Sequence, residues 1–160
     1  MPGLHGVRGV GPQYMCGIAG IVGQSEPKWL RRMHSMLVHR GPDDVGEHHD
    51  EAARVRLGHR RLSIIDLDGG YQPMALERAG LRIVFNGEIF NAPELRRELE
   101  AEGHKFATGH SDTEVLLHLY DRDGEGLLER LNGMFAFVIH DTRRGRLFGA
   151  RDQCGIKPLY

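Results

Sequence analysis

A cysteine beside a short apolar run is the side chain in this sequence best suited to nucleophilic chemistry. Cys16 lies between Met15 and Gly17 in the segment "QYMCGIAGIVG". The glycine leaves the backbone beside the thiol free to approach a substrate. A lone cysteine is more commonly a buried structural residue, and a nucleophilic thiol needs a base, usually a histidine. The ten histidines do not decide between these interpretations, because none lies in a recognised cysteine-hydrolase signature.

A second source of a base is the backbone of the cysteine itself. If the chain began at Met15, removal of that methionine would leave Cys16 with an α-amine whose pKa is about 8. Such an amine could take the thiol proton, directly or through one water, and return it to a leaving amine. With residues 1–15 attached, this nitrogen is an amide and cannot act as a base. We therefore expect residues 1–15 to be a leader that is disordered or absent from the mature protein.

Length and composition restrict the kind of protein. A chain of 160 residues fits one domain of common size. The formal net charge is -1 and no basic block occurs, so nucleic acid is not expected as a partner. No apolar run approaches membrane-spanning length, and residues 1–14 lack the apolar core of a signal peptide, so no membrane is expected either. Cys16 and Cys154 are expected to be free thiols in a reducing compartment, the cytoplasm.

The histidines were also considered as metal ligands. They show no metal-like spacing along the sequence, and "EHH" at 47–49 is predicted to lie in a charged loop. The sequence therefore predicts no metal site.

Apolar spacing in the first half of the chain predicts a strand over 18–22 and a helix that begins at Pro27. The predicted apolar face of that helix comprises Trp29, Leu30, Met33, Met36 and Leu37. The helix should end at "HRGPDD", because the residue before a proline avoids the helical region. Extended segments are predicted at 55–57, 61–66 and 81–86.

The second half of the chain contains stronger local signals. Asn91 is expected to cap a helix that ends at Gly103, and Ser111 with Glu114 has the capping-box spacing for the next helix. "GMFAFVIHD", the turn "TRRG" and "RLFGARD" predict a hairpin over 133–152. Strands gathered into hairpins with helices between them predict an α+β fold with mostly antiparallel sheets.

Eight segments, taken together and in order, resemble the glutaminase domain of glutamine-hydrolysing asparagine synthetases over residues 15–160. They are "MCGIAGIVG", "HRGPDD", "GHRRLSIIDL", "GGYQPM", "VFNGEIFN", "GHSDTEVLLHLY", "LNGMFAFVIHD" and "RDQCGIKPLY". This family belongs to the class II glutamine amidotransferases, which are N-terminal nucleophile hydrolases. The resemblance implies a four-layer αββα sandwich and a type 2 glutamine amidotransferase domain over 16–160. It also implies that the domain is C-terminally incomplete and that the synthetase domain is absent.

The resemblance implies catalytic roles for three residues. Cys16 would attack the glutamine side-chain amide to give a thioester. The side-chain amide of Asn86 and the backbone N–H of Gly87 would stabilise the oxyanion, which needs fixed donors aimed at the developing charge. Taken alone, an Asn–Gly pair is more typical of a tight hairpin turn.

The same resemblance implies the residues that bind glutamine. Arg61 would bind the α-carboxylate through its planar guanidinium, and Glu88 and Asp112 would bind the α-ammonium group. Asn86 and Gly87 would also contact the substrate. The segment lining the substrate would comprise Leu62, Ser63, Ile64 and Ile65. Taken alone, Asp112 could be an ordinary helix cap, and Arg61 or Glu88 a solvated surface charge.

The implied partners follow from the family. L-Glutamine is the expected substrate, and this chain is expected to need no cofactor. ATP and Mg are expected only for the missing synthetase (ATP-pyrophosphatase) domain, where ammonia would amidate aspartate; a homodimer stays open. Two alternatives remain: a non-catalytic glutamine-binding domain whose Cys16 amine is blocked by the leader, and a truncated product with no stable fold. Cys154 is interpreted as a small apolar substitute and not as a second nucleophile.

Overall fold

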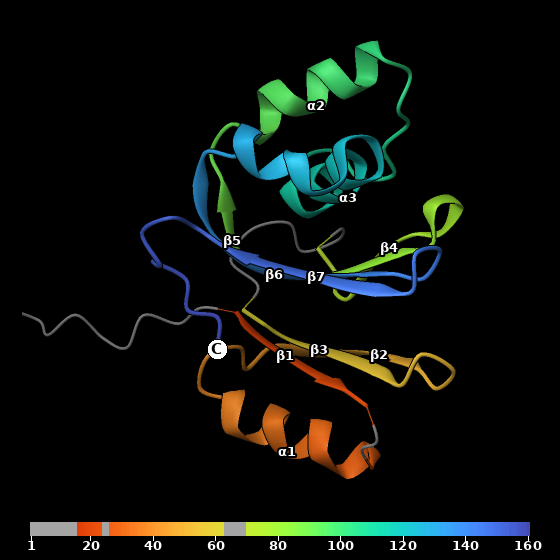
Figure 1. Ribbon diagram of the computed structural model, residues 1–160. Coiled ribbons are helices and arrows are strands. Elements are labelled where there is room, and N and C mark those ends of the chain that lie inside the picture. The colour runs from red at the N-terminus through yellow and green to blue at the C-terminus, as the bar shows by residue number, and fades with distance from the viewer. Residues whose placement is uncertain (1–15, 24–25, 63–69) are drawn as a thin grey trace, which may run out of the picture.

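Four layers make up the chain in its computed structural model, which describes residues 16–23, 26–62 and 70–160. Helix α1 (Pro27–Leu37) covers one sheet, while α2 (Ala92–Ala101) and α3 (Asp112–Asp123) cover the other, and the two sheets stack between them (Figure 1). The prediction of an α+β fold with αββα layers is confirmed. The predicted leader (1–15) and the predicted substrate-lining residues Ser63, Ile64 and Ile65 lie outside the described residues.

The first sheet has three strands and α1 on its outer face. In spatial order its strands are β1 (Gly17–Val22), β3 (Val55–Arg61) and β2 (Asp44–Asp50), all antiparallel. A glycine in β3 lets the helix approach closely, since a Cβ at Gly58 would lie 2.1 Å from His34 Nε2. The absence of a side chain at this position therefore makes room for a buried histidine.

Strand β2 corrects one prediction. Residues 47–49, expected in a charged loop, lie within this strand. Its sequence is "DVGEHHD", in which polar residues occupy both faces, so no apolar alternation marks it as a strand. Antiparallel pairing with β3, from Asp44 opposite Arg61 to Asp50 opposite Val55, supplies the hydrogen-bonding partner that makes this segment a strand.

The second sheet has four antiparallel strands. In spatial order they are β4 (Met74–Leu76), β5 (Leu81–Ile89), β6 (Gly133–Asp141) and β7 (Arg146–Arg151). Two 3-10 segments, η1 (Glu77–Ala79) and η2 (Gly124–Arg130), complete the regular structure. The predicted hairpin is confirmed, with Asp141 paired to Arg146 across the turn. Strand β4 was not predicted, because three residues are too few to show a period.

The apolar core is divided unequally between the layers. A large cluster lies between the second sheet and helices α2 and α3 and includes Phe85, Leu99, Leu116, Tyr120 and Phe137. The cluster between the two sheets is small, built from Val55, Leu57 and Val84 with Ile18, Val138 and Leu147 packed against it. Polar side chains therefore occupy both ends of the space between the sheets.

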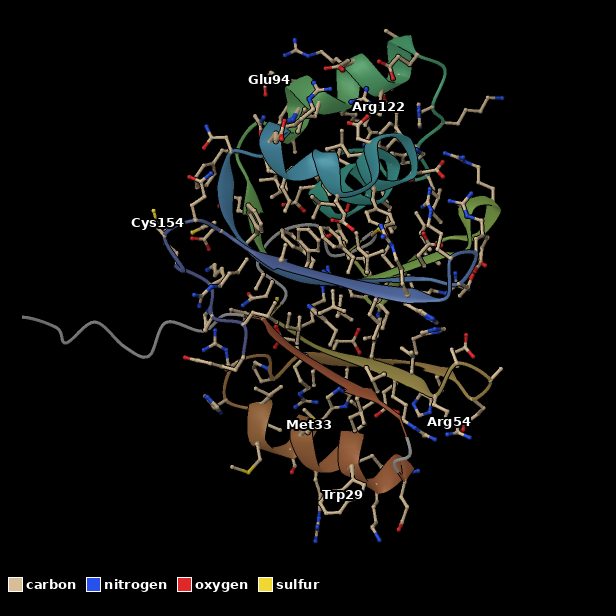
Figure 2. All side chains as sticks on the ribbon, viewed as in Figure 1. Trp29, Met33, Arg54, Glu94, Arg122 and Cys154 are labelled. Carbon is tan, nitrogen blue, oxygen red and sulfur yellow. The ribbon has the colours of Figure 1, made fainter. Side chains whose placement is uncertain are left out.

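The buried face of α1 differs from the predicted one. The side chains that face the sheet are Leu30, His34 and Leu37. Trp29, Met33 and Met36 are 47%, 38% and 75% exposed, and Figure 2 shows Trp29 on the side of the helix away from the sheet. Both triplets have helical spacing, so periodicity alone could not choose between them. The buried face is set by the close packing of His34 against Gly58 of β3. This contact is with a distant segment, so the sequence of the helix alone does not reveal it.

The two predicted helix caps have different outcomes. Ser111 Oγ accepts the Glu114 N–H at 3.4 Å, which confirms the cap of α3. The Glu114 carboxylate does not complete the box; it accepts the N–H groups of residues 107 and 108. Asn91 is the N-cap residue of α2, as predicted, but its side chain makes no capping hydrogen bond and bonds the backbone of residues 130 and 132 instead. Among the described residues, no helix is long and apolar enough to cross a membrane.

Two alanine substitutions in α1 test the reassigned face. Leu30→Ala should lower the free energy of unfolding by about 2–5 kcal/mol, because it leaves a cavity under a fully buried side chain. Met33→Ala, one turn further along on the outer side, should cost at most about 1 kcal/mol. Urea unfolding followed by circular dichroism measures both. Equal losses would restore the predicted face, and a cooperative transition of the unmodified chain would exclude the alternative of no stable fold.

Candidate active site

A cavity of about 450 Å³ opens where the ends of both sheets meet the beginning of α3. Every predicted site residue that the structure describes lines it: Cys16, Arg61, Leu62, Asn86, Gly87, Glu88 and Asp112. The positions come from four separate parts of the chain. The fold therefore gathers the predicted set at one place.

Cys16 lies immediately before β1 and is half-buried. The N–H of Leu62, just after β3, lies 3.5 Å from its sulfur. The backbone carbonyl oxygen of Cys16 accepts the Arg40 Nε–H at 3.4 Å. The antiparallel pairing of β1 with β3 thus holds the thiol beside the strand end that carries Arg61.

Asn86 and Gly87 lie in the middle of the sheet and not in a turn. They belong to β5 and pair with Ala136 and Phe135 of β6. A Cβ at Gly87 would lie 2.1 Å from the Met134 carbonyl oxygen, so only glycine fits there. Asn86 is buried and lines the cavity. The hairpin-turn interpretation of this pair is therefore wrong.

The charged side chains around the cavity have both signs. Arg61 is buried, with its guanidinium carbon 5.3 Å from the centre of the Tyr71 ring. Asp112 Oδ2 accepts the Ile89 N–H at 3.2 Å. Burial raises the pKa of Asp112, and the charge of nearby Glu88 adds to this effect against the backbone hydrogen bonds that lower it. A cation bound here would relieve this unfavourable charge.

Several further polar residues of the cavity, among them His59 and Gln72, were not singled out by the sequence. His59 is buried beside Arg61, and burial lowers its pKa to about 4 despite a hydrogen bond with the backbone of Phe85. Its Nε2 atom has no hydrogen-bond partner within the described parts of the chain. Gln72 Oε1 accepts the Phe85 N–H at 2.6 Å. Both lie in the quoted motifs "GHRRLSIIDL" and "GGYQPM", but a single histidine or glutamine has no spacing signal of its own.

Lys157 is another polar residue of the cavity that the sequence did not single out. The carboxylate of Asp152 holds its backbone. Asp152 accepts the backbone N–H groups of Phe135, Ile156 and Lys157 at 3.1, 2.9 and 3.0 Å. Burial would raise the pKa of Asp152, but these N–H groups outweigh it and the pKa is lowered. The Lys157 side chain is buried at the cavity, and burial lowers its pKa.

Cys154 lies apart from this arrangement. It is exposed, and Figure 2 shows it at the outer edge of the C-terminal segment. It is not among the described residues that line the cavity. The interpretation of Cys154 as a small apolar substitute, and not as a second nucleophile, stays a prediction.

Comparisons with known proteins define the class. The family model described as "Glutamine amidotransferase domain" matches residues 15–160. The chain therefore belongs to the glutamine amidotransferase domain family. Within it, the predicted resemblance to the glutaminase domain of glutamine-hydrolysing asparagine synthetases is confirmed by the relatives that follow.

The relatives share one description. "Asparagine synthetase [glutamine-hydrolyzing] 1" of Bacillus subtilis (strain 168) is 48% identical over 153 residues, which are 91% of this chain and 24% of that protein. The asparagine synthetase of Asparagus officinalis is 44% identical and is matched over 25% of its length by 91% of this chain. This chain therefore spans about a quarter of these relatives. Among solved structures, the glutamine phosphoribosylpyrophosphate amidotransferase of B. subtilis has a TM-score of 0.49 and 31% identity, covering 62% of this chain and 23% of that one.

Replacing Asp112 by Asn tests the charge balance of the cavity. The pKa of Asp112 is raised in the folded chain, so ionisation above its unfolded value of about 3.9 disfavours folding. Asp112→Asn keeps an oxygen to accept the Ile89 N–H and should melt at a higher temperature than the wild type at pH 7. The difference should vanish below about pH 4, where the carboxyl is protonated in both states. Glu129→Gln, an exposed charge change, is the control; a lower melting temperature for Asp112→Asn at pH 7 would contradict the assignment.

Proposed function

We propose that this chain hydrolyses the side-chain amide of L-glutamine to glutamate and ammonia. The observation that carries the proposal is the convergence of Cys16, the Asn86–Gly87 pair, Arg61 and Asp112 on one cavity. The chain's membership of the glutamine amidotransferase domain family supports it. The alternative of a non-catalytic glutamine-binding domain is not favoured by these relatives.

The reaction would proceed through a thioester. Cys16 Sγ attacks the amide carbon of glutamine, a carbon–sulfur bond forms, and the carbonyl oxygen becomes an oxyanion. The Asn86 side-chain NH₂ and the Gly87 N–H would donate to that oxygen. Collapse of this intermediate breaks the carbon–nitrogen bond and releases ammonia once the nitrogen is protonated. Water then hydrolyses the thioester to glutamate by the same oxyanion route.

The base in this scheme is the α-amine of Cys16. It would take the thiol proton and give it to the departing ammonia. Cys16 lines the cavity immediately before β1, so a free amine on this residue would lie beside the substrate as well as the thiol. The form that begins at Cys16 would be the active one.

Substrate recognition would use the opposite charges of the cavity. Arg61 offers two parallel N–H donors to the α-carboxylate, which a lysine could not do with the same geometry. Asp112 and Glu88 would bind the α-ammonium, and Leu62 would contact the substrate from the end of β3. The segment that includes Ser63, Ile64 and Ile65 would complete this wall.

The activity of a whole protein of this kind is a further part of the proposal. The names of the relatives combine asparagine synthesis with glutamine hydrolysis. Each relative is about four times as long as the part that this chain matches. Ammonia from this site would amidate aspartate on a synthetase domain that uses ATP and Mg, whereas glutamine hydrolysis itself would use no cofactor. A cytoplasmic location and a homodimer are parts of the same proposal.

The first test concerns the free amine of Cys16. Glutaminase activity should be proportional to the fraction of molecules whose first residue is Cys16, measured by intact mass on a chain that starts at Met15. With residues 1–15 attached, the amide nitrogen cannot accept the proton, and only the few per cent of thiolate present near pH 7 is left. Cys16→Ala should abolish activity, and Cys154→Ala is the matched control that should not. Full activity with the leader attached would show that another group is the base.

The second test concerns the oxyanion donors. Asn86→Ala should lower kcat by about 10²–10³ and leave KM almost unchanged, since the donor acts on charge that develops in the transition state. Asn86→Asp keeps the size of the side chain but removes the amide donor, so it should lose activity as well. A tenfold increase in KM at constant kcat would mean that Asn86 only binds substrate.

A further inference from the structure

Three potential metal ligands meet at the end of the sheets opposite the cavity. His48 and Asp50 lie two residues apart on β2, and His140 lies on β6 of the other sheet. Their ligand atoms all lie within 4.8 Å of one another. We propose that His48, Asp50 and His140 bind a divalent transition-metal ion of the zinc type, which joins the two sheets. The site is distinct from glutamine hydrolysis and does not depend on that proposal.

The spacing of the two imidazoles suits such an ion. His48 Nε2 and His140 Nδ1 are 3.4 Å apart. Two nitrogens at about 2.0–2.1 Å from a tetrahedral zinc ion would themselves be separated by about 3.3–3.4 Å. The observed separation exceeds the usual range of about 2.7–3.2 Å for an N–H donor and its acceptor. Little movement of either ring would be needed to admit an ion.

The third ligand is already oriented by the backbone. Asp50 Oδ1 accepts the Ala53 N–H at 2.9 Å, which is the kind of supporting contact that holds a metal-binding carboxylate in place. A water would take the fourth position. His140 also lines a hollow of about 300 Å³ together with Val22, Val55 and Leu147, and this hollow gives an ion a way in.

The positive charge of Arg82 opposes the binding of a cation, and Arg146 also lines the hollow. Arg82 faces the same region, since it pairs with His140 across β5 and β6. Its guanidinium donates to both oxygens of Glu77 at 2.8 Å, which compensates much of this charge.

The donor set and its place indicate the kind of ion and its role. Two imidazoles and one carboxylate favour zinc, copper or nickel over magnesium and calcium, which prefer oxygen ligands. The register places His48 opposite Leu57 and Asp50 opposite Val55, just outside the small inter-sheet core. The ion would hold the sheets together where apolar contacts end, so its effect should be on stability and not on catalysis.

The experiment measures metal binding and melting of the full 160-residue chain. Titration calorimetry with zinc chloride should give one ion per chain, and zinc should raise the melting temperature, whereas magnesium and calcium should leave it unchanged. Bound cobalt should give the visible spectrum of nitrogen and oxygen ligation without a thiolate charge-transfer band, which separates this site from Cys16 and Cys154.

Conservative variants assign the ligands. His48→Gln and Asp50→Asn, both at half-buried positions, should weaken zinc binding by more than the roughly 10–100-fold that loss of a supporting contact alone costs. They should also lose the rise in melting temperature. The control is His49→Gln, the neighbouring residue on β2, whose ring contacts Glu47 and Arg56 instead. Absence of binding by the wild type, or equal binding by all variants, would overturn the proposal.

Discussion

The inward face of β3 is the constraint on which the rest of the molecule depends. Successive residues of a strand point to opposite faces, so Val55, Leu57, His59 and Arg61 all face the second sheet. The first two form most of the small apolar contact between the sheets, and the last two line the cavity. One strand therefore fixes both the stacking of the sheets and the place of the site. A register slip of a single residue would exchange this whole set for the residues that face α1.

Glycines allow neighbouring elements to approach closely at several places. Gly58 admits His34 from α1, and Gly87 admits the backbone of β6. In β2, a Cβ at Gly46 would lie 1.8 Å from the Gln72 carbonyl oxygen. The chain thus brings polar groups together by omitting side chains at chosen positions.

The sequence predicted the layers and most of the described site, because strong local signals and family motifs coincide. The 133–152 hairpin, the Ser111 cap, Cys16, Asn86 and Asp112 all belong to contiguous segments. The errors arose where contacts between distant segments decide. The buried face of α1 depends on Gly58, the polar strand β2 depends on its partner β3, and His48 approaches His140 across 92 residues of sequence. Lys157 and His59 are buried by packing against distant parts of the chain, so the spacing of nearby residues in the sequence does not predict their burial.

Some ionisable groups of the cavity are buried without full compensation of their charge. Asp112 and His59 both have pKa values shifted toward their neutral forms, mainly by burial. Such groups reduce the stability of the empty chain in exchange for a site arranged in advance. Ligand binding would then return part of that stability, because it replaces missing solvation with opposite charge.

The carboxylate of Asp152 gives the C-terminal segment a behaviour of its own. Residues 152–160 have no place in either sheet, and three backbone N–H groups of residues 135, 156 and 157 end on this one side chain. Because the pKa of Asp152 is lowered in the folded chain, the contribution of this carboxylate is present above its unfolded pKa and is lost as the pH falls. In terms of hydrogen exchange, the amides of residues 156 and 157 should open together as one small cooperative unit, independently of the core. Acid would thus weaken the attachment of the segment that holds Lys157 at the cavity.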